Sequence, residues 1–261
     1  MDYYVPSVAL SVRMLKLLSR YKYKACSLTQ IAELTGANKT TCLRVLRTLE
    51  AEDLIKYDAQ TKQYSLGQYL IPLGYRALQL NDSVSRATAE LRSVANSTGL
   101  TTVLIERLQD DHLIYIASEE PLGEVHISVS IGQQFPLVGA GFGRCFLAYD
   151  DESSWPRWID QGLVEYTPQS ITDAQLFVNI LRDIRSTGYH VSHGGLMQGV
   201  SSVAAPIFGK HGDVEWVMAC LATTSELQSE RAESVAHTLL HTTQALSEWN
   251  GYHTGEGGKM R

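Results

Sequence analysis

Residues 27–54 constrain the fold more than any other stretch, because their apolar residues follow the pattern of two short helices joined by a tight turn. We expect Thr29 to cap the first helix and Gly36 to end it in a left-handed conformation. Asn38 should cap the second helix. Each helix would bury one apolar stripe. The stripes comprise Ile31, Ala32 and Leu34 in the first helix and Leu43, Leu46 and Leu49 in the second.

The outward side of the second helix combines short polar groups with longer cations. These residues are Lys39, Thr40, Thr41, Arg44 and Arg47. A helix that enters the major groove of DNA uses such groups to contact base edges and phosphates. An ordinary amphipathic hairpin with a solvated face is the alternative, and the residues that follow favour DNA binding.

Two strand-like runs come next, at residues 55–57 and 63–66, around a polar tip at residues 58–62. A hairpin in this place is the wing of a winged helix-turn-helix. We expect Lys62 and Tyr64 to touch the DNA backbone, and we count Thr29 among the DNA-contacting residues. A helix at residues 7–18 should complete the head. Its expected core residues are Val8, Val12, Leu15, Leu17 and Leu18.

The distribution of charge agrees with a DNA-binding head. Residues 1–76 hold eleven Lys and Arg against six Asp and Glu, a net charge of +5, although the whole chain has a net charge of −6. Residues 77–261 therefore carry −11. A basic head on an acidic remainder indicates one part that binds nucleic acid and another part that does not.

The four cysteines show neither a CxxC pair nor a metal-ligand spacing with histidine. We expect Cys26, Cys42, Cys145 and Cys220 to be reduced core residues. A redox switch at Cys42 is the alternative. The sequence has no apolar run of about eighteen residues and no signal-peptide pattern, so we expect a cytoplasmic protein without a membrane partner.

The rest of the chain predicts a stiff helical connector and an α+β body. The expected helices span residues 68–80, 84–97, 143–149, 173–187 and 229–249, with a break at 81–83. The period of two from residue 101 onward predicts strands at residues 103–105, 113–116, 126–129, 200–208 and 214–221. These strands would form one antiparallel sheet, and residues 251–261 would be a disordered tail.

Over residues 6–249 the chain resembles the IclR family of bacterial transcription regulators. The resemblance rests on SLTQIAELTG, KTTCLRVLRTLE, the LG steps at 66–67 and 73–74, FPLVGAGFGRCFLA (135–148) and GYHVSHGGLMQGVSSVAAPIFGKHGDV (188–214). It implies a winged helix-turn-helix at residues 1–67, a linker helix at 68–82 and a GAF-like mixed α/β effector-binding domain at 83–250. It also implies a homodimer or homotetramer that binds a palindromic operator in double-stranded DNA and responds to a small molecule, as a repressor or an activator.

The resemblance further implies an effector pocket. In the family, backbone amides at a glycine-rich bend hold ligand carboxylates, since unsatisfied N–H groups at a helix start attract anions. A glycine turn that serves only chain geometry is the alternative. The residues that match the family's pocket are Ile127, Phe135, Gly141, Phe142, Gly143, Ser192, Ser202, Ala219 and Leu221.

The sequence departs from the pattern of relatives that bind small polar acids. Those relatives have an acidic residue near 192–195 and hydroxyls on the last central strand, whereas this chain has Ser-His-Gly-Gly and the apolar Ala219 and Leu221. Phe142 and Cys145 stand where many relatives have small residues. Each unpaired polar group of a buried ligand costs roughly 1–3 kcal/mol, so we expect a larger, more apolar effector, such as an aromatic acid or ester. His190 or His193 could add a hydrogen bond.

The sequence contains no nucleophile elbow, no paired carboxylates at a useful spacing and no phosphate-binding loop with its lysine. Ser201 and Ser202, beside a strand that contains histidine, come nearest to a nucleophilic site, but no base and orienting partner accompany them. We therefore expect no catalytic residue, metal or cofactor. An enzyme of GAF-like fold and a module that binds protein through its head are the alternative functions.

Overall fold

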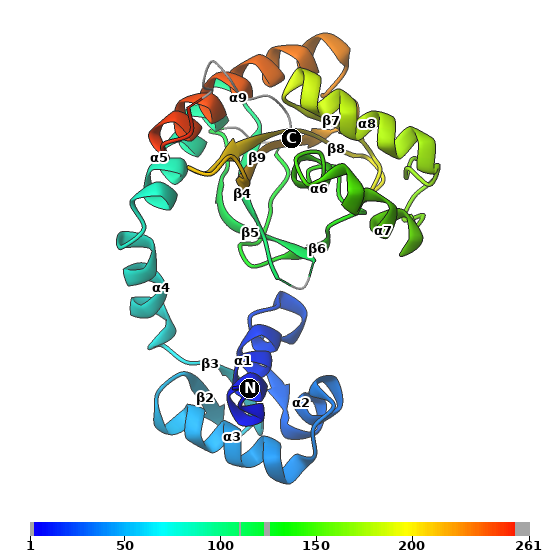
Figure 1. Ribbon diagram of the computed structural model, residues 1–261. Coiled ribbons are helices and arrows are strands. Elements are labelled where there is room, and N and C mark those ends of the chain that lie inside the picture. Colours follow the sequence, from blue (N-terminus) through cyan, green and yellow to red (C-terminus); the bar gives the residue numbers. More distant parts are fainter. Residues whose placement is uncertain (1–2, 110, 123–125, 254–261) are drawn as a thin grey trace. The chain divides into compact units, whose positions relative to one another are not determined.

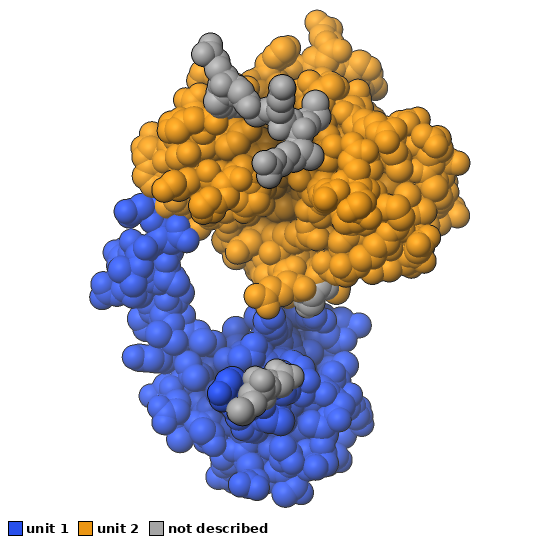
Figure 2. All heavy atoms as spheres, viewed as in Figure 1, with its two compact units in different colours: residues 1–82 blue, residues 83–261 orange. Residues whose placement is uncertain are grey.

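The computed structural model describes residues 3–109, 111–122 and 126–253, and it divides into the two compact units drawn in Figures 1 and 2, Met1–Asp82 and Ser83–Arg261. Unit 1 contains a three-stranded antiparallel sheet in the order β1-β3-β2. Its elements are α1 (Pro6–Leu18), a 3-10 turn (Tyr21–Tyr23), β1 (Cys26–Ser27), α2 (Leu28–Thr35), α3 (Lys39–Ala51), β2 (Ile55–Asp58), β3 (Gln63–Leu66) and α4 (Leu70–Gln79).

Helix α2 begins two residues earlier than expected. Ser27, not Thr29, caps α2: its Oγ accepts a hydrogen bond from the Gln30 amide at 3.3 Å, and Gln30 Oε1 accepts from the Ser27 amide at 2.9 Å. This reciprocal pair is a capping box. Gly36 ends α2 at φ +67°, and Asn38 caps α3 through the Thr41 amide, as predicted.

The core of unit 1 corrects several expected faces. Val8, Val12 and Leu34 are exposed, because α1 and α2 carry apolar residues on more than one side and the sequence alone does not say which side packs. In α3, Leu43 is only partly buried. The buried residues of the three helices are Leu10, Met14, Leu17, Leu18, Ile31, Ala32, Cys42, Val45, Leu46 and Leu49.

Unit 2 is built on a six-stranded antiparallel sheet in the order β6-β5-β4-β9-β8-β7. Its strands are β4 (Thr101–Arg107), β5 (His112–Glu119), β6 (Gln134–Pro136), β7 (His190–His193), β8 (Val200–Phe208) and β9 (Val214–Thr223). Its helices are α5 (Asp82–Thr98), α6 (Gly143–Leu147), α7 (Trp155–Asp160), α8 (Ala174–Thr187) and α9 (Ser229–Trp249), with a 3-10 turn at Glu152–Ser154.

The central strands are buried on both faces, and successive side chains enter different cores. On β4, Leu104 joins the cluster formed with α5 and α9, whereas Val103 and Ile105 join the cluster formed with α6, α7 and α8. Figure 1 shows these two helix groups on opposite faces of the sheet. The α6 side also contains the cavity described below.

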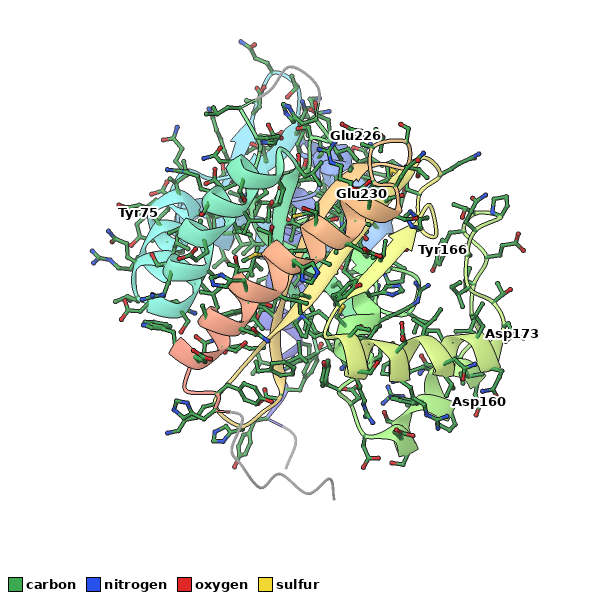
Figure 3. The ribbon with its side chains drawn as sticks, turned by 90° about the horizontal axis from the view of Figure 1, so that it is seen from above. Tyr75, Asp160, Tyr166, Asp173, Glu226 and Glu230 are labelled. Atoms are coloured by element: carbon green, nitrogen blue, oxygen red, sulfur yellow. The ribbon has the colours of Figure 1, made fainter. Side chains whose placement is uncertain are left out.

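Several boundaries differ from the expectation. Residues 126–129 are not a strand. The Ile127 carbonyl accepts a hydrogen bond from the Thr101 hydroxyl, and the side chains of His126 and Ser128 bond to Glu120. In α8, Leu176 is exposed and Phe177 takes its place in the core. Asp173 caps that helix, at the end labelled in Figure 3.

Tyr252 was expected in a disordered tail, yet its ring stacks on Phe208 at 4.7 Å. Residues 254–261 lie outside the described part of the chain. Within that described part, no helix combines the length and the apolar character that crossing a bilayer requires.

We predict that Ser27→Ala destabilises α2 by about 1 kcal/mol, because it removes half of the capping box. Thr29→Ala is the matched control and should have little effect, since the exposed Thr29 makes no cap. Hydrogen exchange of α2 amides in the full chain measures this local stability, as none of the four tryptophans lies in unit 1. Equal loss of protection in both variants would contradict the assignment of the cap.

Candidate functional site

Helix α3 presents the cationic surface that the sequence predicts. Lys39, Thr40 and Thr41 form its first turn, with Arg44 and Arg47 further along, and all five side chains are exposed. The opposite side of α3 packs into the core of unit 1 through Cys42, Val45, Leu46 and Leu49. The helix is thereby fixed on one side and free to contact a partner on the other.

The two wing residues expected to contact DNA differ in exposure. Lys62 is exposed at the hairpin tip, in a left-handed conformation with φ +55°. Tyr64 is 5% exposed and packs in the core, with its ring 4.7 Å from that of Tyr57, so little of its side chain is available to DNA. The alternation along β3 points it inward because its cross-strand neighbour is the buried Cys26. A depression of about 430 Å³ is lined by residues that include Thr29, Arg47, Glu50, Lys62 and Tyr64.

Unit 2 contains a cavity of about 140 Å³ over the α6 face of the sheet. This volume is close to the roughly 150 Å³ that holds a benzene ring in an apolar protein cavity. Seven residues that the sequence analysis assigned to the pocket line it: Ile127, Phe135, Gly141, Phe142, Ser192, Ser202 and Leu221. Gly143 and Ala219 are not among its lining residues.

Those two exceptions have physical causes. Ala219 lies on the same face as Leu221 but is fully buried in the core under α6. Gly143 is required for close packing, since a Cβ there would overlap the carbonyl oxygen of Leu137. Its amide already donates to Ala140 O at 3.0 Å. Among the described residues the structure records no acceptor for the amides of Gly141 and Phe142, which remain the available donors of the bend.

Sheet register sets the polar floor of the cavity. Ser192 on β7 pairs with Ser202 on β8, and Ser202 pairs with Leu221 on β9. The hydroxyls of the two serines have no hydrogen-bond partner among the described residues. A Cβ on Gly141 would overlap the Ser192 side chain, so Gly141 lets the bend approach this hydroxyl. The hydroxyls of Ser192 and Ser202 can therefore both form hydrogen bonds with a ligand.

The wall of the cavity is aromatic. The ring of Tyr115 lies 4.7 Å from that of Phe135 and 5.8 Å from that of Phe142. Burial raises the pKa of Tyr115, which keeps its phenol protonated. The described lining residues include no charged side chain. Such a site favours an aromatic or aliphatic body with few polar groups.

Sequence reasoning missed Tyr115, Ser128, Val129, Gln133, Gly195, Leu196, Met197, Val200 and Ser201. Leu196 and Met197 come from the loop between β7 and β8, which is held by hydrogen bonds from the Thr167 and Ser170 hydroxyls to Gly194 O and Gly195 O at 2.7 Å each. Met197 remains 54% exposed. Two large apolar residues within the glycine-rich GGLMQG run were the available signal.

Arg144 is the buried cation beside this site. It is 3% exposed, and its Nη1 donates to Nε2 of His190 at 3.0 Å, which requires a neutral imidazole. Burial lowers the pKa of Arg144 to about 10. Burial, and next the charges of Arg144 and His193, lower the pKa of His190 to about 3. The predicted contribution of His190 to the effector site is not seen, because it does not line the 140 Å³ cavity.

All four cysteines are free and buried. Cys42 is 0% exposed, and its Sγ lies 3.8 Å from Ala37 O, so an oxidant does not reach it in this conformation. This burial argues against the redox-switch alternative. Among the described residues no group of His, Cys, Asp and Glu has the arrangement of a metal site.

Comparison with known families decides the classification. Residues 7–59 match the IclR helix-turn-helix domain, and residues 75–248 match the C-terminal domain of the bacterial transcriptional regulator IclR. The chain belongs to the IclR family. It is a DNA-binding transcription regulator with an effector-binding domain, from a family of regulators and not of enzymes.

Individual relatives cover nearly the whole chain. The DNA-binding transcriptional repressor YiaJ of Escherichia coli is 28% identical over 92% of this chain and 86% of its own. A crystal structure of an IclR transcriptional regulator from Alicyclobacillus acidocaldarius is 56% identical, with a TM-score of 0.92 over 95% of this chain and 100% of that chain. An IclR homologue from Microbacterium hydrocarbonoxydans, crystallised with 4-hydroxybenzoate, shares the fold, with a TM-score of 0.78 at 16% identity over 94% of this chain and 98% of that chain.

The neutral state of His190 predicts a pH dependence of stability. Between pH 6.5 and about 3 the unfolded chain binds a proton that folded His190 does not, so acidification favours unfolding. His190→Gln should flatten the decline in the free energy of unfolding from pH 6.5 to 4 by up to about 1.4 kcal/mol per pH unit. Urea denaturation followed by tryptophan fluorescence measures it. His237→Gln, on the exposed side of α9, should keep the wild-type slope; equal slopes in all three proteins would refute the prediction.

Proposed function

We propose that this regulator binds a palindromic operator as a dimer or tetramer and that an aromatic acid or ester modulates its affinity for DNA. The exposed row of cations and threonines on α3, together with the exposed Lys62 of the wing, is the observation that carries the DNA-binding half of the proposal. The neutral, aromatic cavity carries the effector half.

The two kinds of DNA contact follow from position on unit 1. Lys39, Thr40, Thr41 and Arg44 lie on the exposed side of α3 from its first turn onward, where a recognition helix presents groups to base edges. Arg47 and Lys62 border the same depression between α3 and the wing, which suits phosphate contacts. Base edges carry sequence information and phosphates do not.

An apolar helix favours an oligomer. None of the side chains of α4 is buried, although the segment carries large apolar residues that are more than a third exposed: Tyr69, Ile71, Leu73, Tyr75, Leu78 and Leu80. Tyr75 projects away from the helix in Figure 3. Contiguous exposed apolar surface marks an interface, and a second copy of this chain would give the two-fold pair of recognition helices that a palindrome requires.

We predict that Arg44→Ala weakens binding to the operator by about 1–3 kcal/mol and relaxes specificity at one base pair. Lys62→Ala should weaken binding to all DNA sequences alike and reduce the salt dependence of binding by about one released counterion. Electrophoretic mobility shifts over a series of salt concentrations measure both the affinity and its salt dependence. The DNA is first the region upstream of the gene, and then its single-base variants and one half-site. Tyr64→Phe is the control and should bind as wild type. Identical behaviour of the Arg44 and Lys62 variants would refute this division.

The effector assignment rests on chemistry. A cavity without charged lining residues offers little to a small, multiply charged acid, whereas an aromatic ring would replace water against Tyr115, Phe135 and Phe142. The polar end of the ligand would accept hydrogen bonds from the hydroxyls of Ser192 and Ser202 and the free amides of Gly141 and Phe142. The bound 4-hydroxybenzoate of the Microbacterium homologue is an acid of this class.

We predict that benzoate or 4-hydroxybenzoate binds the full chain more tightly than glyoxylate or pyruvate in calorimetry. Ser202→Ala should weaken binding of the aromatic acid by about 0.5–1.5 kcal/mol, the contribution of one neutral hydrogen bond. Ser186→Ala, on the exposed side of α8, is the matched control. Tight binding of the small acids alone would overturn the assignment.

A further inference from the structure

A second cavity lies at the other side of β7. It measures about 460 Å³ and is formed by residues of α6, α8, β7 and the segment before α8. Its polar lining residues include Arg144, Gln169, Asp183, His190 and Ser192. Of these only Ser192 also lines the 140 Å³ cavity. Neither DNA binding through unit 1 nor effector binding in the 140 Å³ cavity involves this second cavity.

Arg144 is the unusual group in it. The side chain is 3% exposed, and the described residues supply it with no carboxylate. Its one recorded hydrogen bond goes to the neutral His190, which compensates none of the positive charge. A buried charge without a counter-charge is expensive, which is also why burial lowers the pKa of this guanidinium. An anion in the cavity would remove that cost.

The geometry of the guanidinium selects the kind of anion. His190 occupies Nη1, whereas Nε is buried and unpaired, and Nη2 has no recorded partner among the described residues. The Nε and Nη2 donors form the edge that binds two oxygens of one carboxylate or phosphate in parallel. The free edge is therefore the bidentate edge.

We propose that this second cavity is a binding site for a small monocarboxylate, held by the Nε–Nη2 edge of Arg144. The carboxylate of Asp183 lines the same cavity and repels added negative charge, which disfavours a phosphate dianion relative to a monoanion. His190 positions Arg144 from the opposite edge. Because the site shares only Ser192 with the aromatic cavity, it does not depend on the effector assigned above.

The test uses acetate as the probe and the full chain. Thermal unfolding followed by tryptophan fluorescence reports on unit 2, which holds all four tryptophans. Acetate should raise the midpoint saturably beyond sodium chloride of equal ionic strength, since a ligand that binds only the folded state stabilises it. Arg144→Gln should lower the affinity for acetate at least about tenfold, because it removes a charge-assisted bidentate contact.

Asp183→Asn provides an opposite and independent readout. Asp183 is an exposed residue of α8, so the variant should fold, and it should tighten acetate about two- to fivefold by removing a like charge. Arg182→Gln is the matched control: it removes a neighbouring positive charge that pairs with Glu152 outside the cavity, and acetate binding should persist.

Three results would overturn the proposal. They are a response to acetate no larger than that to chloride, an unchanged affinity in Arg144→Gln, and an unchanged or weaker affinity in Asp183→Asn. If Arg144→Gln does not fold, the Asp183 variant decides alone. Inorganic phosphate that stabilises more than acetate would reject the monocarboxylate class. Binding of benzoate with no response to acetate would leave the aromatic cavity intact and remove only this second site.

Discussion

The central strands of unit 2 are buried on both faces, and this requirement organises the domain. Val217, Ala219 and Leu221 of β9 face one core while Met218 and Cys220 face the other, so helices must cover both sides. On the side with α5 and α9 the buried residues form one hydrophobic cluster. The other side is covered by α6, α7, α8 and loops, which leave a cavity above Ser192, Ser202 and Leu221. The cavity follows from that incomplete cover.

Polar groups left unpaired by this packing are the sites where a ligand adds stability. Examples in unit 2 are the hydroxyls of Ser192 and Ser202 and the Nε of Arg144, which lie on β7, β8 and α6. Burying such groups without partners costs free energy, which a ligand with matching acceptors recovers. For the same reason the aromatic cavity suits a ligand with one polar end, and the buried positive charge of Arg144 suits an anion.

Unit 1 solves a different problem. A small three-helix head must hold its recognition helix rigid with few core residues, and it does so through Cys42, Val45, Leu46 and Leu49 on one side of α3. The hairpin contributes Tyr64 to the same core. The cations are consequently left on the exposed surface, and the head has a positive charge while the remainder of the chain has a negative one. This separation keeps the sensing domain away from phosphates.

The sequence alone determined where α2 ends and α3 begins and that the cations of α3 stay exposed. Gly36 and Asn38 end and begin helices because left-handed backbone and side-chain capping are short-range effects, and the cations of α3 are exposed because burying them would be costly. The cap of α2 is local as well, since Ser27 and Gln30 form a capping box three residues apart. Of the nine residues that the resemblance to the IclR family implied for the pocket, seven line the 140 Å³ cavity. Tertiary packing alone decided which face of α1 is buried, that Tyr64 points inward, and that Arg144 is enclosed beside His190. Each of these three depends on neighbours distant in sequence, whose contacts no local pattern encodes.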